Sequence, residues 1–251
     1  MLSGTESGGY FHPRFSPDAS FVVSTTENYY GLTKHDIASG SRLRLTDAPS
    51  AGYGMCFSDD GSSIYYSRAE MRNAMRFMSL ERVNTFNSKK FSLGIPLRLK
   101  LTPARFVSRV YLTTEDDGMM LHHNGKTTLL APLGKESYYW ATVSPDGKHI
   151  VFSTAYHGTC ICDINGENVV RLGRLNAPQW LGNDCVIGMQ ETDDEKGRTL
   201  QSKLVVRSID GKTAQTLLLG QKVAMYPSAS ADGKHVSFNN EIGQIFIVDL
   251  E

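Results

Sequence analysis

The chain has few cysteines and no excess of either charge. Its 251 residues contain four cysteines, and none of them form a C-x-x-C pair of the kind that holds zinc. Cys160 and Cys162 alternate in one predicted strand, while Cys56 and Cys185 lie far from them in the sequence, so we expect buried free thiols. The 26 Lys and Arg residues balance the 26 Asp and Glu residues. No net charge therefore draws the protein to nucleic acid, and no nucleic-acid partner is expected.

Long apolar runs and recognisable hydrolase motifs are also missing. No apolar run approaches the 18 or so residues that span a bilayer, so no membrane span is expected. The amino terminus lacks a charged segment followed by an apolar one, which is the pattern of a secretion signal. If Met1 is the native start we expect a cytoplasmic protein, and if a signal peptide was removed, a periplasmic or extracellular one. No G-x-S-x-G elbow of a serine hydrolase is present.

What the chain does contain is a repeat, and Tyr138–Gly173 is its most complete copy. YYWATV reads as a strand, and SPDGK reads as a turn because Pro145 presets φ and Gly147 tolerates a positive φ. A second strand over Ile150–Thr154, a third in TCICDI, an Asn-Gly turn and a fourth strand in NVVRLG follow. This order predicts a four-stranded antiparallel meander.

The turn of this repeat recurs along the chain at a regular spacing. The copies FSPDAS, FSDDGS, VSPDGK and ASADGK place their serines at Ser16, Ser58, Ser144 and Ser230. The separations are 42, 86 and 86 residues, so each long gap has room for one degenerate copy. We place these copies at KLTPARF, around Thr102, and at QWLGNDCVIGM, where Gly182, Asn183 and Asp184 form the turn and Trp180 precedes it.

Six copies of about 43 residues, with four strands each, predict an all-β, six-bladed β-propeller that occupies residues 1–251 as one domain. The last copy ends after its third strand, Ile245–Leu250. Met1–Ser3 aligns with the outermost strand of a blade, so we expect this amino-terminal strand to complete the last blade and close the ring. The fifth copy carries an insertion, Gln190–Lys203, which we expect to form a charged hairpin.

The SPDG turns at a 43-residue period, each preceded by an apolar or aromatic residue, and loops such as DINGENVVRLG resemble the repeats of TolB-type propellers. The resemblance covers nearly the whole chain, although the third and fifth copies depart from the motif. It implies a six-bladed propeller that serves as a partner-binding scaffold, without an additional amino-terminal domain of the kind that TolB carries.

Aligning the copies gathers aromatic and basic residues at the start of the innermost strands, where the mouth of a propeller channel lies. Tyr and Trp offer contact area together with a polar group, which suits a binding surface. We therefore predict a non-catalytic binding module, most simply for another protein, with no catalytic residue, metal or cofactor. The inner-strand candidates are His12, Arg14, Tyr53, Tyr139, Trp140 and Tyr226, and the loop candidates are Glu27, Arg68, His157 and Glu241.

The alternative is a propeller that binds an oligosaccharide, or that processes one as a metal-dependent lyase or hydrolase, at the same mouth. A calcium site needs several oxygen ligands, and the aligned inner positions contain no carboxylate. A histidine-held metal would draw on His12, His122, His123 and His157. His122 and His123 are neighbours in a predicted strand and point to opposite faces, so they do not share one site.

Overall fold

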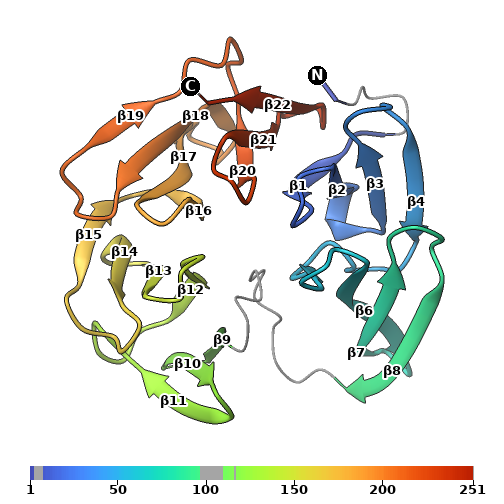
Figure 1. The fold of residues 1–251 in the computed structure, drawn as a ribbon, viewed down its shortest axis with the longest axis horizontal. Coiled ribbons are helices and arrows are strands. Elements are labelled where there is room, and N and C mark those ends of the chain that lie inside the picture. Colours follow the sequence, from blue (N-terminus) through green and yellow to red (C-terminus); the bar gives the residue numbers. More distant parts are fainter. Residues whose placement is uncertain (3–7, 97–109, 116, 251) are drawn as a thin grey trace.

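In a computed structural model of the chain, six antiparallel sheets stand side by side around a central axis (Figure 1). The structure describes residues 1–2, 8–96, 110–115 and 117–250. Within these residues nearly all regular structure is strand, and the one helical element is a three-residue 3-10 turn, η1 (Glu27–Tyr29). The arrangement is the predicted six-bladed β-propeller, and its fold is TolB-like.

The blades follow one another along the chain. Blade one is β1 (Phe11–Phe15), β2 (Phe21–Thr25), β3 (Leu32–Asp36) and β4 (Arg42–Thr46). Blade two is β5 (Cys56–Phe57), β6 (Ser63–Arg72), β7 (Met75–Asn84) and β8 (Lys90–Pro96). Blade three is described as β9 (Val110–Glu115), β10 (Gly118–His123) and β11 (Lys126–Leu130). Blade four is β12 (Tyr138–Val143), β13 (His149–Thr154), β14 (Gly158–Asp163) and β15 (Val170–Gly173). Blade five is β16 (Asn176–Leu181), β17 (Cys185–Asp193), β18 (Thr199–Ser208) and β19 (Ala214–Thr216). Blade six is β20 (Met225–Ala229), β21 (His235–Asn239) and β22 (Ile245–Asp249).

Each blade is the expected meander, since strands that follow in sequence pair antiparallel in the sheet. The insertion of blade five forms the expected hairpin, because β17 and β18 continue to pair as far as Asp193 and Thr199. The degenerate copy around Thr102, which was expected to supply the first strand of blade three, lies outside the described residues. Three of the cysteines are buried free thiols, and Cys185 is a partly buried one.

The recurring turns owe their shape to a serine and an aspartate. In blade four, Ser144 Oγ donates to Asp146 Oδ1 at 2.6 Å and accepts a hydrogen bond from the His149 amide at 2.9 Å. The same Ser-to-Asp bond closes the equivalent turns at Asp18, Asp60 and Asp232. The Ser58 hydroxyl and the Ser62 amide lower the pKa of Asp60 to about 2. These carboxylates are therefore held as parts of turns.

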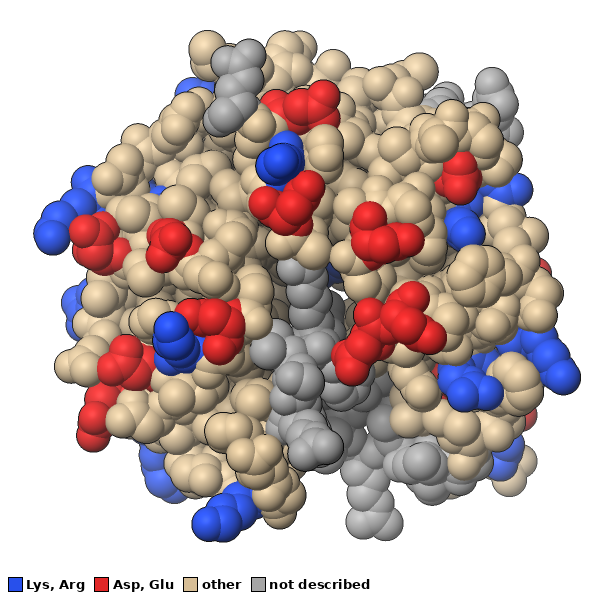
Figure 2. Space-filling view, in the orientation of Figure 1, with Lys and Arg blue, Asp and Glu red and all other residues tan. Residues whose placement is uncertain are grey.

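Figure 2 shows acidic side chains around the central opening of the face that it draws.

Packing between neighbouring blades forms the core. Phe152 of blade four is fully buried in a cluster that also contains Leu112 and Met119 of blade three. Trp180, at the degenerate turn of blade five, is buried against blade four and donates its indole N–H to the Thr142 carbonyl at 3.2 Å. Trp180 occupies the position in the fifth copy that Val143 occupies in the fourth, and it also links blades four and five.

The amino-terminal residues lie beside the last blade. The Leu2 amide donates to the Ile245 carbonyl at 2.7 Å, so this residue borders β22, as expected for the closing strand. Further along the chain, the Tyr10 amide donates to the Gly243 carbonyl at 2.7 Å. Ser3 lies outside the described residues. These two bonds join the amino-terminal segment to the last blade, and the amino terminus lies near the start of β22 in Figure 1.

We predict that Gly243→Ala weakens this junction. Gly243 has φ +78°, and a Cβ there would lie 2.6 Å from the Tyr10 nitrogen and 2.7 Å from the Gly9 Cα. Backbone strain and this close approach should together lower the free energy of unfolding by about 3 kcal/mol. Gly220→Ala is the matched control, because its φ is +65° with nothing within 4 Å of the added Cβ, and it should cost only about 1 kcal/mol. Equal losses for the two variants in urea unfolding would contradict the proposed junction.

Candidate binding site at the channel mouth

The candidate site occupies the face opposite the Ser-Asp turns. In blades one, two, four, five and six the innermost strand starts on this face and runs toward the turn, and the second strand returns to it. The connections that reach this face are therefore those between second and third strands and those between blades. This face is called the mouth below.

Four innermost strands break their register at the same point near the mouth. Between Phe11 and Arg14 of β1, the inner strand has one more residue than its partner β2. Equivalent β-bulges lie in β12, β16 and β20. Bulges of this kind re-aim side chains and are frequent beside functional sites.

A residue with positive φ marks each bulge. The φ values are 53° at His12, 54° at Trp140, 47° at Ala177 and 53° at Tyr226. The left-handed region costs a residue with a side chain about 1–2 kcal/mol, and glycine would avoid this cost. Blade two does place a glycine there, Gly54, with φ 74°. The alignment of His12, Gly54, Trp140 and Tyr226 from the sequence is thus confirmed, and three of these positions hold strained, ring-bearing residues.

The rings at the mouth form a continuous row across blades six, one and two. The His12 ring lies 3.7 Å from that of Tyr226 and 4.6 Å from that of Tyr29, measured between centroids. Tyr29 meets Tyr53 edge-on at 5.3 Å. The His12 amide donates to Asn239 Oδ1 of blade six at 3.0 Å, which fixes the bulge. On blade four, Tyr139 and Trp140 form a separate edge-on pair at 5.0 Å.

Sequence reasoning missed Tyr29, although the expected loop contains it. Tyr29 ends η1 with φ 58°, and this backbone conformation turns the loop so that its ring reaches His12. Glu27, two residues earlier, was the candidate chosen from that loop. A tyrosine in a loop between second and third strands was the available signal, and the charged residue of the same loop was favoured over it.

Arg14 brings a positive charge to this row without a counter-ion. It is partly buried, and among the described residues no carboxylate or hydrogen-bond acceptor pairs with it. Burial lowers the pKa of Arg14 to about 10, so the guanidinium stays charged at neutral pH. Burial, assisted by Arg14, lowers the pKa of His12 to about 3, so the imidazole is neutral there. Among the described residues, the aromatic row therefore combines neutral rings with a cation, Arg14, that has no counter-ion.

The loop candidates lie apart from the aromatic row. His157 approaches Glu136 at 3.0 Å. Arg68 was expected in a loop, but β6 continues through it, and its guanidinium pairs with the buried Glu81 at 3.1 Å. Glu27 lies in η1, and Glu241 is exposed in the turn before β22. None of these four has a ring contact or hydrogen bond to the aromatic row among the described residues.

Two hairpins extend beyond the other blades on the mouth side. The strands of β6–β7 and β17–β18 have 9 or 10 residues each, whereas β2 and β3 have five. Blades two and five stand across the ring from each other (Figure 1). The extended hairpins therefore flank the mouth from opposite sides.

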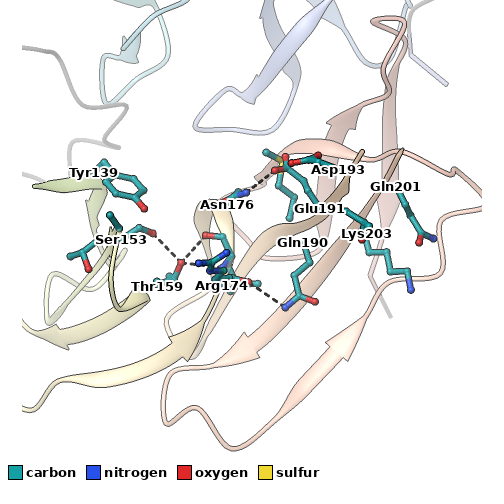
Figure 3. Close-up of a pocket in the computed structure, with 16 residues that line it drawn as sticks. Tyr139, Ser153, Thr159, Arg174, Asn176, Gln190, Glu191, Asp193, Gln201 and Lys203 are labelled. Atoms are coloured by element: carbon teal, nitrogen blue, oxygen red, sulfur yellow. Dashed lines mark hydrogen bonds between the residues drawn. The ribbon is translucent and has the colours of Figure 1, made fainter. Parts of the chain in front are cut away.

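A cavity of about 570 Å³ opens between blades four and five beside the second hairpin. Figure 3 shows Tyr139 and Ser153 on one side, Glu191, Asp193 and Lys203 on the other, and Arg174 and Asn176 between them. The lining is polar, with Gln190 and Gln201 adding two amides. Tyr139, which is 38% exposed, is the one candidate from the sequence that borders it.

The described residues contain neither a cluster of metal ligands nor a membrane-spanning helix. No three His, Cys, Asp or Glu side chains among them gather closely enough to hold a metal ion. His122 instead lies between Thr113 and Thr127, each with a 3.1 Å contact to its ring nitrogens. Among the described segments there is also no helix whose length and apolar character would let it cross a membrane.

Comparison with known proteins shows similarity in fold. No protein-family model and no curated protein sequence matches the chain. TolB from Acinetobacter baumannii is 20% identical with a TM-score of 0.66, and the match covers 87% of this chain and 56% of TolB. An oligogalacturonate lyase from Vibrio parahaemolyticus is 15% identical with a TM-score of 0.54, covering 100% and 80%. A chain of a mitotic checkpoint complex is 11% identical with a TM-score of 0.60, covering 96% and 89%.

The chain thus spans little more than half the length of the TolB structure that it matches. The similar structures include both TolB and a lyase, and at these identities they establish the TolB-like propeller fold alone.

Proposed function

We propose that this propeller is a non-catalytic scaffold that binds another protein at the mouth. The observation that carries the proposal is the set of strained, ring-bearing residues, His12, Trp140 and Tyr226, repeated at one position of three blades. Strain of this kind lowers stability, persists only where the surrounding structure holds the backbone in place, and is frequent at functional sites. A protein partner is the use that fits a row of adjacent rings at an open mouth.

The chemistry of the row supports a protein partner. Aromatic residues and arginine are the residue types most enriched where binding energy concentrates in protein interfaces. The row offers His12, Tyr29, Tyr53 and Tyr226, with the uncompensated Arg14 beside it. The flanking hairpins β6–β7 and β17–β18 limit the approach of a partner to the space between them. The resemblance to TolB-type repeats implies a binding scaffold as well.

Selection from a random 12-residue peptide library displayed on phage tests the proposal. Peptides enriched on the wild-type protein should bind Tyr53→Ala at least tenfold more weakly, because the 43% exposed Tyr53 ring ends the row. Phe86→Ala is the matched control, since Phe86 is a 69% exposed aromatic residue in the β7–β8 turn, away from the mouth. Peptides that bind both variants as they bind the wild type would overturn the proposal.

A further inference from the structure

The cavity between blades four and five holds charges of both signs that are not paired with each other. Arg174 and Lys203 supply two cations, and Glu191 and Asp193 supply two carboxylates. None of these four side chains forms an ion pair with any residue that the structure describes. Elsewhere in the same hairpin such pairs do form, since Arg198 meets Asp194 at 2.8 Å. The four charged groups are thus available to a ligand.

Glu191 marks the acidic side of the cavity. Its side chain is partly buried, and its Oε2 accepts one hydrogen bond, from Asn176 Nδ2 at 2.7 Å. Burial raises the pKa of this carboxyl, and Asp193 raises it further. A carboxylate that is removed from water without a cation beside it is costly, so a cation from a ligand would be favoured there.

Arg174 marks the basic side. It follows β15 in the connection to blade five, and its guanidinium is exposed to the cavity. Burial raises the pKa of the Tyr139 hydroxyl, and Arg174 opposes that rise, which places the guanidinium within electrostatic reach of the phenol. A guanidinium and a phenol hydroxyl are both hydrogen-bond donors that a carboxylate accepts.

We infer that the cavity receives a short peptide segment of the partner that carries one acidic and one basic side chain. The acidic side chain lies toward Arg174 and Tyr139, and the basic one toward Glu191 and Asp193. The volume of about 570 Å³ is within the range of pockets that enclose small ligands. The amides of Gln190 and Gln201 suit the peptide groups of such a segment. This inference rests on the proposed function and specifies the part of the partner that is bound.

A double-mutant cycle on a peptide from the phage selection tests the inference. Arg174→Gln should weaken binding about tenfold, and it should have no further effect on a peptide whose acidic residue is replaced by its amide. Glu191→Gln should behave in the same way toward a peptide whose basic residue is replaced by glutamine. Lys196→Gln, in the exposed turn of the β17–β18 hairpin, is the control and should bind as the wild type does.

The outcomes separate the two proposals. The inference would be overturned if the losses in affinity from the protein substitution and the peptide substitution simply add. It would also be overturned if the selected peptides depend on Tyr53 but contain no acidic and basic pair. Either result would leave the proposed function standing. If no selected peptide depends on Tyr53, both fail. Coupling of Arg174 to the acidic residue and of Glu191 to the basic residue would support the inference, because a merely structural role would weaken all peptides alike.

Discussion

The double variant Arg14→Met, Tyr53→Ala is expected to lose at least a hundredfold in affinity for a peptide selected on the wild-type protein, about 3 kcal/mol, without losing stability. Tyr53 is 43% exposed, so its truncation leaves no cavity in the core. Arg14 is a partly buried cation with no counter-ion among the described residues, so an apolar side chain of similar length should stabilise the fold by about 1 kcal/mol. The measurements are fluorescence anisotropy with the labelled peptide and urea unfolding.

This split between affinity and stability is what distinguishes a binding residue from a packing residue. If Arg14 and Tyr53 served only to pack blades, the double variant would unfold at a clearly lower urea concentration. Unchanged affinity together with reduced stability would therefore contradict the assignment of this pair to the site. Phe86→Ala again provides the comparison, because it removes an exposed ring from another part of the surface.

The second large effect is a loss of stability on mild acidification. His35 of β3 is 1% exposed, its Nε2 lies 2.7 Å from Ser24 Oγ, and its Nδ1 has no partner among the described residues. Burial, and to a smaller extent Arg42, lowers the pKa of His35 from 6.5 to about 4. The unfolded chain therefore takes up this proton near pH 6.5, before the folded protein does. Between pH 7 and pH 4 the free energy of unfolding should fall by about 3 kcal/mol from this residue.

His12 acts in the same direction, since its pKa is lowered to about 3. A His35→Phe variant should thus lose part of the pH dependence between pH 7 and 4 and keep the part due to His12. His123→Gln is the comparison variant, because it removes an exposed imidazole at the end of β10 instead of a buried one. Unfolding free energies that do not change between pH 7 and 4 in the wild type would contradict the buried, neutral state of His35.

The repeat alone predicted the architecture because four copies contain a turn that can be recognised in the sequence, and their spacing locates the two degenerate copies. The Ser-Asp pair, the following glycine and the alternating apolar strands act locally, so a reader of the sequence can locate them without knowing the neighbours. The same reasoning placed Trp180 at the degenerate turn of blade five. It also identified the common position of His12, Trp140 and Tyr226. The bulge adds one residue at the same point of each of these copies, so the alignment of the copies is not shifted.

The rest of the site depends on contacts between distant segments. Tyr29 joins the row only because η1 turns its ring toward His12, and no periodic pattern encodes that turn. Arg68 was expected in a loop, since nothing local shows that β6 and β7 keep pairing as far as Arg72 and Met75. The cavity between blades four and five combines Arg174, from the connection between these blades, with Glu191, from the extended hairpin of blade five. The repeat pattern does not show that these two segments border one cavity.

Hydrogen–deuterium exchange of the protein, with and without a saturating selected peptide, tests the central claim most directly. If the mouth is the binding surface, the peptide should slow exchange in the segments around the bulges of β1, β12 and β20 and in the β17–β18 hairpin. Exchange in the Ser-Asp turns on the opposite face and in the outer strands β4 and β11 should stay the same. Protection confined to those turns or outer strands would contradict the account.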